Sequence, residues 1–201
     1  MKLYYCETLN PRKVCALARH LELPVEFVRV DLKSGEHRKP EFLAINPNGK
    51  VPVLQDADWV LWESNAIMCH LARQAGSDLW PEDERQIEVM RWLLWDANHF
   101  TRHGGSLYFE NLVKPALGMG MPDDGAVKQA EGFFNTYARV LDQHLKGRDF
   151  LVDNRLSIAD FAVAVCLPYA EGARLPLEPY AEIRRWHAGL EKLPAWQKPF
   201  G

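Results

Sequence analysis

Two short segments of the sequence carry groups that could bind a small polar molecule. In the first, a turn cluster at residues 46–49 leads into an apolar segment interrupted by Pro52. Proline cannot donate to a strand ladder and usually marks an edge or an irregular site, so the backbone beside it is available for something other than sheet pairing. In the second, Glu63 and Ser64 follow another apolar segment. If Ser64 opens a helix, its hydroxyl and the first backbone N–H groups form an anion site, reinforced by the helix dipole.

The side chains that most often form disulfides or bind metals are not arranged for either role. The chain has four cysteines, Cys6, Cys15, Cys69 and Cys166. They form no CxxC pair and no paired metal spacing, so we expect reduced thiols. His99 and His103 stand at i, i+4, but no carboxylate or third ligand is patterned with them, so no metal is expected.

Composition and charge narrow the function classes. The chain of 201 residues is 47% hydrophobic and 25% charged, which is ordinary globular content. Its formal net charge is -3 and no run of Lys and Arg stands out, so nucleic acid is not an expected partner. The first apolar segment is too short for a signal peptide, and none approaches the ~18 residues of a membrane span. We therefore expect a soluble, cytoplasmic protein with no membrane partner.

The hydrophobic pattern changes near residues 76–84. Before that boundary, it predicts elements in the order βαβ and then ββα, which favours a small mixed sheet with helices. The predicted strands are 2–6, 26–30, 51–54 and 59–62, and the predicted helices are 12–21 and 64–74. After the boundary, apolar residues recur almost only at helical spacing. Ser157 and Asp160 have the spacing of a capping box, and they predict the start of a buried helix that continues to residue 167.

Three motifs in a fixed order carry a resemblance to a known family. They are NPNGKVPVL, WESNAI and LSIADF, and they lie in a chain whose α/β region precedes a helical region. This combination resembles the cytosolic glutathione transferases over essentially the whole chain, and residues 34–67 are most similar to transferases of the phi type and their bacterial relatives. The resemblance implies a thioredoxin-like glutathione-binding domain at residues 1–78. It also implies an all-helical bundle domain at residues 84–201 that forms the electrophile pocket.

The resemblance assigns the two segments described first to parts of glutathione. It implies a cis Val51-Pro52 bond, an isomer that X-Pro bonds can adopt, and pairing of the Val51 backbone with the cysteinyl residue as an added strand would pair. The Ser64 hydroxyl would bind the γ-glutamyl carboxylate, and Glu63 would meet the neighbouring ammonium. The simpler alternatives are that Pro52 ends an edge strand and that Ser64 is an ordinary N-cap beside a solvated Glu63.

Three further side chains are placed by the resemblance near the glycine end of glutathione. They are His37, Arg38 and Lys50. A cation there would meet the glycine carboxylate. For each of them, an exposed and solvated position is the alternative.

Thiol activation would depend on the loop before Pro11. A free thiol with a pKa of about 8.5 is only slightly ionised at neutral pH, so the enzyme must stabilise the thiolate. Pro11 suits the first turn of a helix whose N-terminus can help, and alignment places Thr8 where phi-type transferases have their catalytic serine. Threonine departs from that pattern because its extra methyl restricts χ1. Asn10 could donate instead, and Tyr5 or Cys6 is also within reach, Cys6 through a mixed disulfide.

The second substrate would bind against the helical domain. Residues 92–110 offer aromatic side chains with a few polar tips, which suits a pocket for a small hydrophobic electrophile. The candidates are Trp95, His99, His103 and Tyr108. The alternative is that these side chains pack in a core. Members of the family are generally homodimers, so a homodimer is expected.

The expected activity is conjugation of glutathione, as co-substrate and without a metal, to small hydrophobic electrophiles. Glutathione-dependent peroxidase or disulfide reductase activity is the variant within the same class. The rival is a non-catalytic glutathione-binding regulatory protein. Retention of Glu63, Ser64 and Val51-Pro52 fits both readings, and only the loop from Thr8 to Asn10 separates them.

Overall fold

The computed structural model describes residues 1–200, which form two compact units. The first unit contains Met1–Trp80 together with the described end of the chain, residues 193–200, and the second contains Pro81–Lys192. The sequence-based boundaries differ at the C-terminus, because they assign residues 84–201 to the helical domain. The last described residues instead pack with the α/β unit, through contacts given below.

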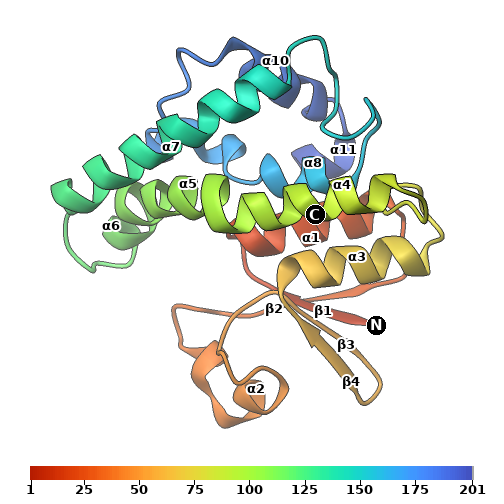
Figure 1. Ribbon diagram of the computed structural model, residues 1–201. Helices are drawn as coiled ribbons and strands as arrows, with labels where there is room; N and C mark the ends of the chain where they lie inside the picture. Colours follow the sequence, from red (N-terminus) through yellow and green to blue (C-terminus); the bar gives the residue numbers. More distant parts are fainter. Residues whose placement is uncertain (201) are drawn as a thin grey trace. The chain divides into compact units, whose positions relative to one another are not determined.

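The first unit is built on a four-stranded mixed sheet (Figure 1). Its strands are β1 (Lys2–Tyr5), β2 (Glu26–Arg29), β3 (Val53–Asp56) and β4 (Trp59–Trp62), in the order β2-β1-β3-β4. β1 is parallel to β2 and antiparallel to β3, and β3 is antiparallel to β4. The helices are α1 (Leu9–His20), the 3₁₀ helix η1 (Glu36–Arg38), α2 (Pro40–Ile45) and α3 (Ser64–Gln74). α1 packs against α3, and the arrangement confirms the predicted thioredoxin-like fold.

Apolar side chains cover both faces of the sheet. Leu3 and Leu54 are opposite each other in register and fully buried, on strands that α1 and α3 contact. Their neighbours Tyr4 and Val53 point to the other face, because successive side chains of a strand alternate. There they pack with Phe42 of α2. The sequence did not predict α2 or η1, because elements this short show no helical period.

The C-terminal segment packs on α1. Its short helix α11 (Pro194–Gln197) contacts α1, and Trp196 is 1% exposed. Arg12 donates from Nη2 to the carbonyl of Trp196 at 2.6 Å, and Arg19 donates from Nε to the carbonyl of Pro199 at 2.7 Å. Phe200 stacks on Tyr5 with ring centroids 5.6 Å apart. These contacts explain why residues 193–200 belong to the first unit.

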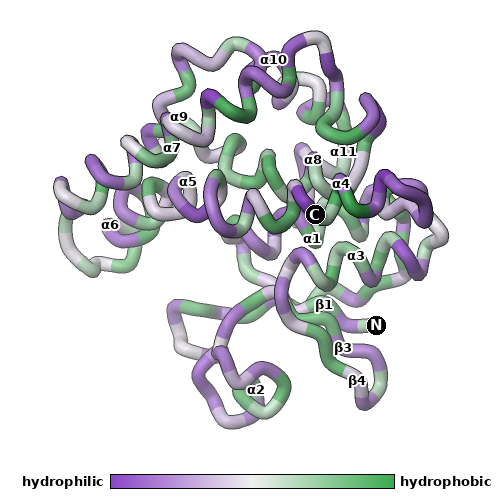
Figure 2. Tube along the Cα trace, in the orientation of Figure 1, coloured by the Kyte–Doolittle hydropathy of each residue, from purple (hydrophilic) through white to green (hydrophobic). Residues whose placement is uncertain are grey.

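The second unit is helical, as predicted. Its elements are α4 (Arg85–Trp95), the π-helix η2 (Asp96–Phe100), α5 (Thr101–Tyr108), the π-helix η3 (Phe109–Val113), α6 (Lys114–Ala116), α7 (Asp124–His144), α8 (Ile158–Val163), the 3₁₀ helix η4 (Leu167–Tyr169), α9 (Ala170–Ala173) and α10 (Ala181–Leu190). Hydrophobic and hydrophilic residues alternate along α4 and α7, as expected for helices with one buried face (Figure 2). All six residues of α8 are buried. Within residues 1–200, no helix is both long and apolar enough to span a bilayer.

The predicted capping box at the start of α8 is confirmed. Ser157 accepts a hydrogen bond from the helix backbone, and its own N–H donates to Oδ2 of Asp160 at 2.9 Å. Asp160 is fully buried and also accepts from the N–H of Leu151 at 3.0 Å and from Nε1 of Trp186 at 3.1 Å. Burial nevertheless raises the pKa of Asp160 from 3.8 to about 6. Asp160 therefore joins three parts of the helical unit through one carboxyl group.

Candidate functional site

A turn held by a buried asparagine presents the backbone of Val51. Asn46 is 2% exposed, donates from Nδ2 to the carbonyl of Lys50 at 2.7 Å, and accepts the N–H of Asn48 at 3.0 Å. The Val51–Pro52 bond that follows is cis, as predicted. Because β3 begins only after this bond, the N–H and C=O of Val51 make no hydrogen bond within residues 1–200. An extended ligand could therefore pair with them.

The first turn of α3 has the features of an anion site. Ser64 is the first helical residue and 8% exposed, and its hydroxyl donates to Oδ1 of Asn10 at 3.5 Å. Ser64 is therefore not an N-cap, and the cap position, Glu63, makes no side-chain bond to the helix. The first N–H groups of α3 lie at the positive end of the helix dipole, so together with the hydroxyl they can bind a carboxylate.

Glu63 has a backbone conformation that is rare for a residue with a side chain. Its φ of 74° and ψ of 112° lie in the left-handed half of the map. Such conformations cost about 1–3 kcal/mol and cluster at ligand sites, where the surrounding fold holds them. The carboxylate is exposed and has no ion-pair partner within the described chain, so it can meet a cationic group of a ligand.

The loop before α1 leaves two polar side chains available at the N-terminus of the helix. Thr8 occupies the cap position and is half-buried, and its N–H donates to the carbonyl of Cys6 at 2.7 Å. Its hydroxyl does not cap the helix and has no hydrogen-bond partner among residues 1–200. Asn10 is exposed, and because its Oδ1 accepts from Ser64, its amide nitrogen is left to donate elsewhere. Both residues can offer a donor to an anionic sulfur at this helix end.

The two other candidates in this loop have less suitable surroundings. Burial, and then the charge of Glu7, raise the pKa of the Cys6 thiol, which disfavours its thiolate at neutral pH. Glu7 itself pairs with Arg29 at 2.7 Å. Tyr5 is buried and packs with Phe27 and Phe200. Tyr5 is therefore a core residue of the first unit.

The structure brings His37 to the turn that contains Lys50. His37 lies in η1 with a buried Nδ1 that has no hydrogen-bond partner in the described part of the chain. Gly49 has φ +57, and a Cβ added there would lie 3.1 Å from the carbonyl oxygen of His37, so only glycine suits this close approach. Arg38 and Lys50 are exposed. These two segments thus carry a buried ring nitrogen without a partner and two exposed cations, and such groups suit a carboxylate ligand.

In the second unit, three of the four predicted pocket residues form an aromatic ladder. Trp95, His99 and His103 lie along the helix that continues from α4 through η2 into α5, and all three contact Tyr137 of α7. The ring centroids of His99 and Tyr137 are 4.6 Å apart and nearly parallel. His103 also stacks on Phe133, at 4.7 Å. Tyr137 and Phe133 complete the ladder, and helical spacing alone did not show that they face the histidines.

Tyr108 is not part of this ladder. It packs against Tyr169 of η4 with ring centroids 5.0 Å apart and at 65°. The structure therefore separates the fourth predicted residue from the other three. The reason is its position, five residues after His103, which turns it to another face of the helix.

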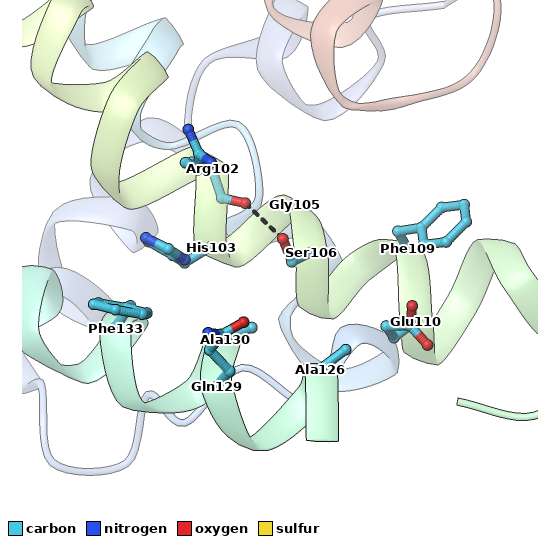
Figure 3. A pocket seen from close by; sticks show the side chains of 10 residues that line it. All are labelled: Arg102, His103, Gly105, Ser106, Phe109, Glu110, Ala126, Gln129, Ala130 and Phe133. Carbon is cyan, nitrogen blue, oxygen red and sulfur yellow. Dashed lines mark hydrogen bonds between the residues drawn. The ribbon is translucent and has the colours of Figure 1, made fainter. Parts of the chain in front are cut away.

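A groove of about 600 Å³ lies beside the ladder, between α5, η3 and α7 (Figure 3). His103 and Phe133 face each other at one end of it, and Phe109 lies at the other. Ser106 donates to the carbonyl of Arg102 at 3.0 Å on its α5 side. Burial, followed by nearby positive charge, lowers the pKa of His103 and favours its neutral form. The groove is therefore partly aromatic and partly polar.

The histidine pair does not belong to a metal-binding cluster. Among residues 1–200, no group of three or more His, Cys, Asp or Glu side chains is arranged to hold a metal ion. His99 and His103 instead use their rings to stack on Tyr137. Their i, i+4 spacing places both rings against Tyr137.

Known proteins are similar to this chain in fold and in sequence. Residues 1–73 match the family of the glutathione S-transferase N-terminal domain, and residues 111–194 match that of the C-terminal domain. Glutathione S-transferase 3 of Zea mays is 33% identical over 196 residues, which cover 94% of this chain and 87% of that protein. The chain belongs to the glutathione S-transferase family. The family predicted from the sequence is confirmed.

Solved structures of glutathione S-transferases have the same fold. Glutathione S-transferase I bound with lactoylglutathione superposes with a TM-score of 0.88 at 29% identity, covering 98% of this chain and 97% of the other. A transferase family member from Pseudomonas fluorescens Pf-5 with two glutathione molecules bound also has a TM-score of 0.88, at 27% identity, covering 98% of this chain and 91% of that one. The whole described chain thus has the fold of a glutathione S-transferase.

Proposed function

We propose that this glutathione S-transferase activates the thiol of glutathione for attack on small hydrophobic electrophiles. The observation that carries the proposal is the meeting of Ser64, at the start of α3, with Asn10, in the first turn of α1. Two helix N-termini converge at this point, and each can stabilise an anion. Glutathione has two anionic groups of the matching kind, the γ-glutamyl carboxylate and the thiolate.

The proposed binding mode follows the tripeptide from end to end. The carboxylate of the γ-glutamyl residue accepts hydrogen bonds from the Ser64 hydroxyl and the first turn of α3, and its ammonium meets Glu63. The cysteinyl backbone pairs with the N–H and C=O of Val51. The glycine carboxylate lies near three side chains, His37, Arg38 and Lys50. The unpaired Val51 backbone and the buried Nδ1 of His37 support this direction.

The proposed chemistry places the sulfur at the N-terminus of α1. The thiol loses its proton to solvent, and the Thr8 hydroxyl and the α1 dipole stabilise the thiolate that remains. The thiolate attacks an electrophilic carbon, a C–S bond forms, and a leaving group such as halide departs with its electron pair. Asn10 is the alternative donor. The reaction uses glutathione as co-substrate and no metal.

We place the electrophile beside the aromatic ladder of Trp95, His99 and His103. Stacked rings offer an apolar surface, and the imidazole nitrogens supply a few polar tips, which suits a small hydrophobic molecule. Tyr108 packs elsewhere, against Tyr169, and is the weaker candidate. Replacing Trp95 with Ala should raise the KM for an aryl electrophile more than the KM for glutathione.

Apolar side chains exposed on both units support a homodimer. Monomeric soluble proteins rarely expose large contiguous patches of apolar side chains. The exposed side chains include Trp59 and Trp62 on β4, Ile87, Met90 and Leu94 on α4, and Val140 on α7. We propose that they contact a second copy of the chain.

The cytoplasm is the compartment we propose for this protein. All four cysteines are free thiols, as is usual in a reducing compartment.

A direct test is conjugation of glutathione to a model aryl halide by the purified protein at neutral pH. We expect turnover that saturates with glutathione. Binding of glutathione without turnover, of either an aryl halide or a peroxide, would instead support a regulatory binding protein. Turnover of peroxide alone would support the peroxidase variant.

A further inference from the structure

Helix α1 carries a lysine that is almost completely buried. Lys13 is 2% exposed, although lysine side chains are rarely buried without a specific reason. Its Nζ donates to Oδ1 of Asn65 at 2.7 Å. Asn65 is the second residue of α3, directly after Ser64. The buried ammonium therefore lies at the junction of α1 with the first turn of α3.

Two contacts one helical turn apart join α1 to α3 at this junction. Asn10 and Lys13 are three residues apart and lie on the same side of α1, and they contact the successive residues Ser64 and Asn65. The Asn10–Ser64 contact, at 3.5 Å, is near the limit of a hydrogen bond. The Lys13–Asn65 bond is short, and a charged donor makes such bonds stronger. Lys13 is therefore the stronger of the two links.

The ammonium of Lys13 lies beside the positive end of the α3 dipole. The N-terminus of a helix carries partial positive charge, so a cation beside the first turn of α3 is disfavoured. A carboxylate bound at that turn reverses the balance, because it attracts both the helix end and the ammonium.

We propose that Lys13 is a positioning residue of the glutathione site. Its bond to Asn65 fixes the first turn of α3 against α1, so that the γ-glutamyl anchor and the thiol-activating loop keep a constant spacing. Its charge favours the anionic ligand at that junction. This inference rests on the proposed function, and it assigns to the reaction a residue that does not itself contact substrate.

The test is a double-mutant cycle on Lys13→Met and Asn65→Leu, with kcat/KM for glutathione and glutathione-induced thermal stabilisation as readouts. Met keeps the length of the lysine stem and removes the ammonium. Lys13→Met should lower kcat/KM about tenfold, and Asn65→Leu should lower it less, because Asn65→Leu keeps the ammonium. The double variant should fall no further than Lys13→Met, because both changes break the same bond. The unfolding midpoint of ligand-free Lys13→Met should stay near that of the parent, since loss of the bond is offset by loss of a buried charge. Lys2→Met is the matched control, because Lys2 is exposed and lies at the start of β1.

Further results distinguish a failure of the Lys13 inference from a failure of the proposed function. Lys13→Arg, which keeps a charged donor, should recover part of the lost kcat/KM, and a purely structural filler would give no such rescue. Additive effects of the two single variants, or full activity of Lys13→Met, would overturn the inference while leaving the proposed function intact. If Lys13→Met does not fold, full activity of Asn65→Leu overturns it equally. A parent protein that does not conjugate glutathione at all would overturn the proposed function itself.

Discussion

The hydroxyl of Ser64 donates to the side-chain oxygen of Asn10 across 3.5 Å, although the two residues are 54 positions apart. One belongs to the first turn of α3 and the other to the first turn of α1. This contact brings two helix N-termini together, and it orients the Asn10 amide so that its nitrogen can donate to a ligand. The two ends of a γ-glutamyl-cysteinyl unit can thus be held by one small region.

Ser64→Ala should weaken glutathione binding. The change removes a donor to a largely buried carboxylate, and a charge-assisted hydrogen bond is worth about 1.5–3 kcal/mol, so the dissociation constant should rise about ten- to a hundredfold. Isothermal calorimetry measures the constant directly. Ser34→Ala, in an exposed turn, is the control and should bind like the parent. An unchanged constant for Ser64→Ala would remove Ser64 from the site.

Thr8 should control the rate more than the affinity. Thr8→Ser keeps the hydroxyl and should preserve or raise conjugation of an aryl halide. Thr8→Ala and Thr8→Val remove the donor, and loss of one preorganised donor costs about 3 kcal/mol of transition-state stabilisation, or about a hundredfold in turnover. Glutathione affinity should stay nearly constant.

Asn10→Ala is the comparison for the Thr8 series, and we expect it to have the smaller effect on turnover. Full activity of Thr8→Ala combined with loss of activity in Asn10→Ala or Cys6→Ala would assign activation to another residue of the loop. Steady-state kinetics at saturating glutathione distinguish these outcomes.

The sequence predicted those elements around the candidate site that lie in continuous motifs. The predicted ranges 59–62 and 64–74 coincide with β4 and α3, because a turn, a change of period and the polar pair at Glu63 mark their ends. The capping box at Ser157 was also correctly predicted, because it depends on neighbouring residues. The cis bond at Val51–Pro52 was correctly expected from the resemblance to the family.

Contacts between distant segments were not predictable in the same way. Nothing in the local pattern shows that the Lys13 ammonium reaches Asn65, or that Tyr137 of α7 meets both histidines of the neighbouring helix. The C-terminal residues read as part of the helical region, but Trp196 packs with Arg12 of α1. Each of these pairings depends on tertiary packing, which one sequence does not specify.

Asp160 should make the stability of the fold depend on pH. Its pKa is raised from 3.8 to about 6 by burial, so the folded state holds a proton that the unfolded chain has already lost between those values. The contribution is largest below about pH 4 and is lost as the pH rises through about 6. One pKa unit corresponds to about 1.4 kcal/mol, so the loss is on the order of 3 kcal/mol. Urea unfolding of the parent and of Asp160→Asn across this range should show their difference shrinking; a constant difference would contradict the prediction.

The chain should form a homodimer through its exposed apolar surfaces. Light scattering at micromolar concentration should give twice the mass of the chain. Leu94→Glu, which places a charge on the exposed apolar face of α4, should shift the protein toward the monomer. Leu117→Glu alters an equally apolar exposed residue outside α4 and α7 and should remain dimeric. A monomer mass for the parent would refute the assembly.

The most direct test of the central claim is ultraviolet titration of the thiolate of glutathione bound to the parent protein. If the loop before α1 and its helix dipole stabilise the sulfur anion, the thiol pKa of bound glutathione should lie well below the value in solution, which is about 8.5 for a free thiol. Thr8→Ala should move it back toward that value. A bound thiol that titrates at its solution pKa in the parent would show that this site holds glutathione without activating it, and would contradict the account.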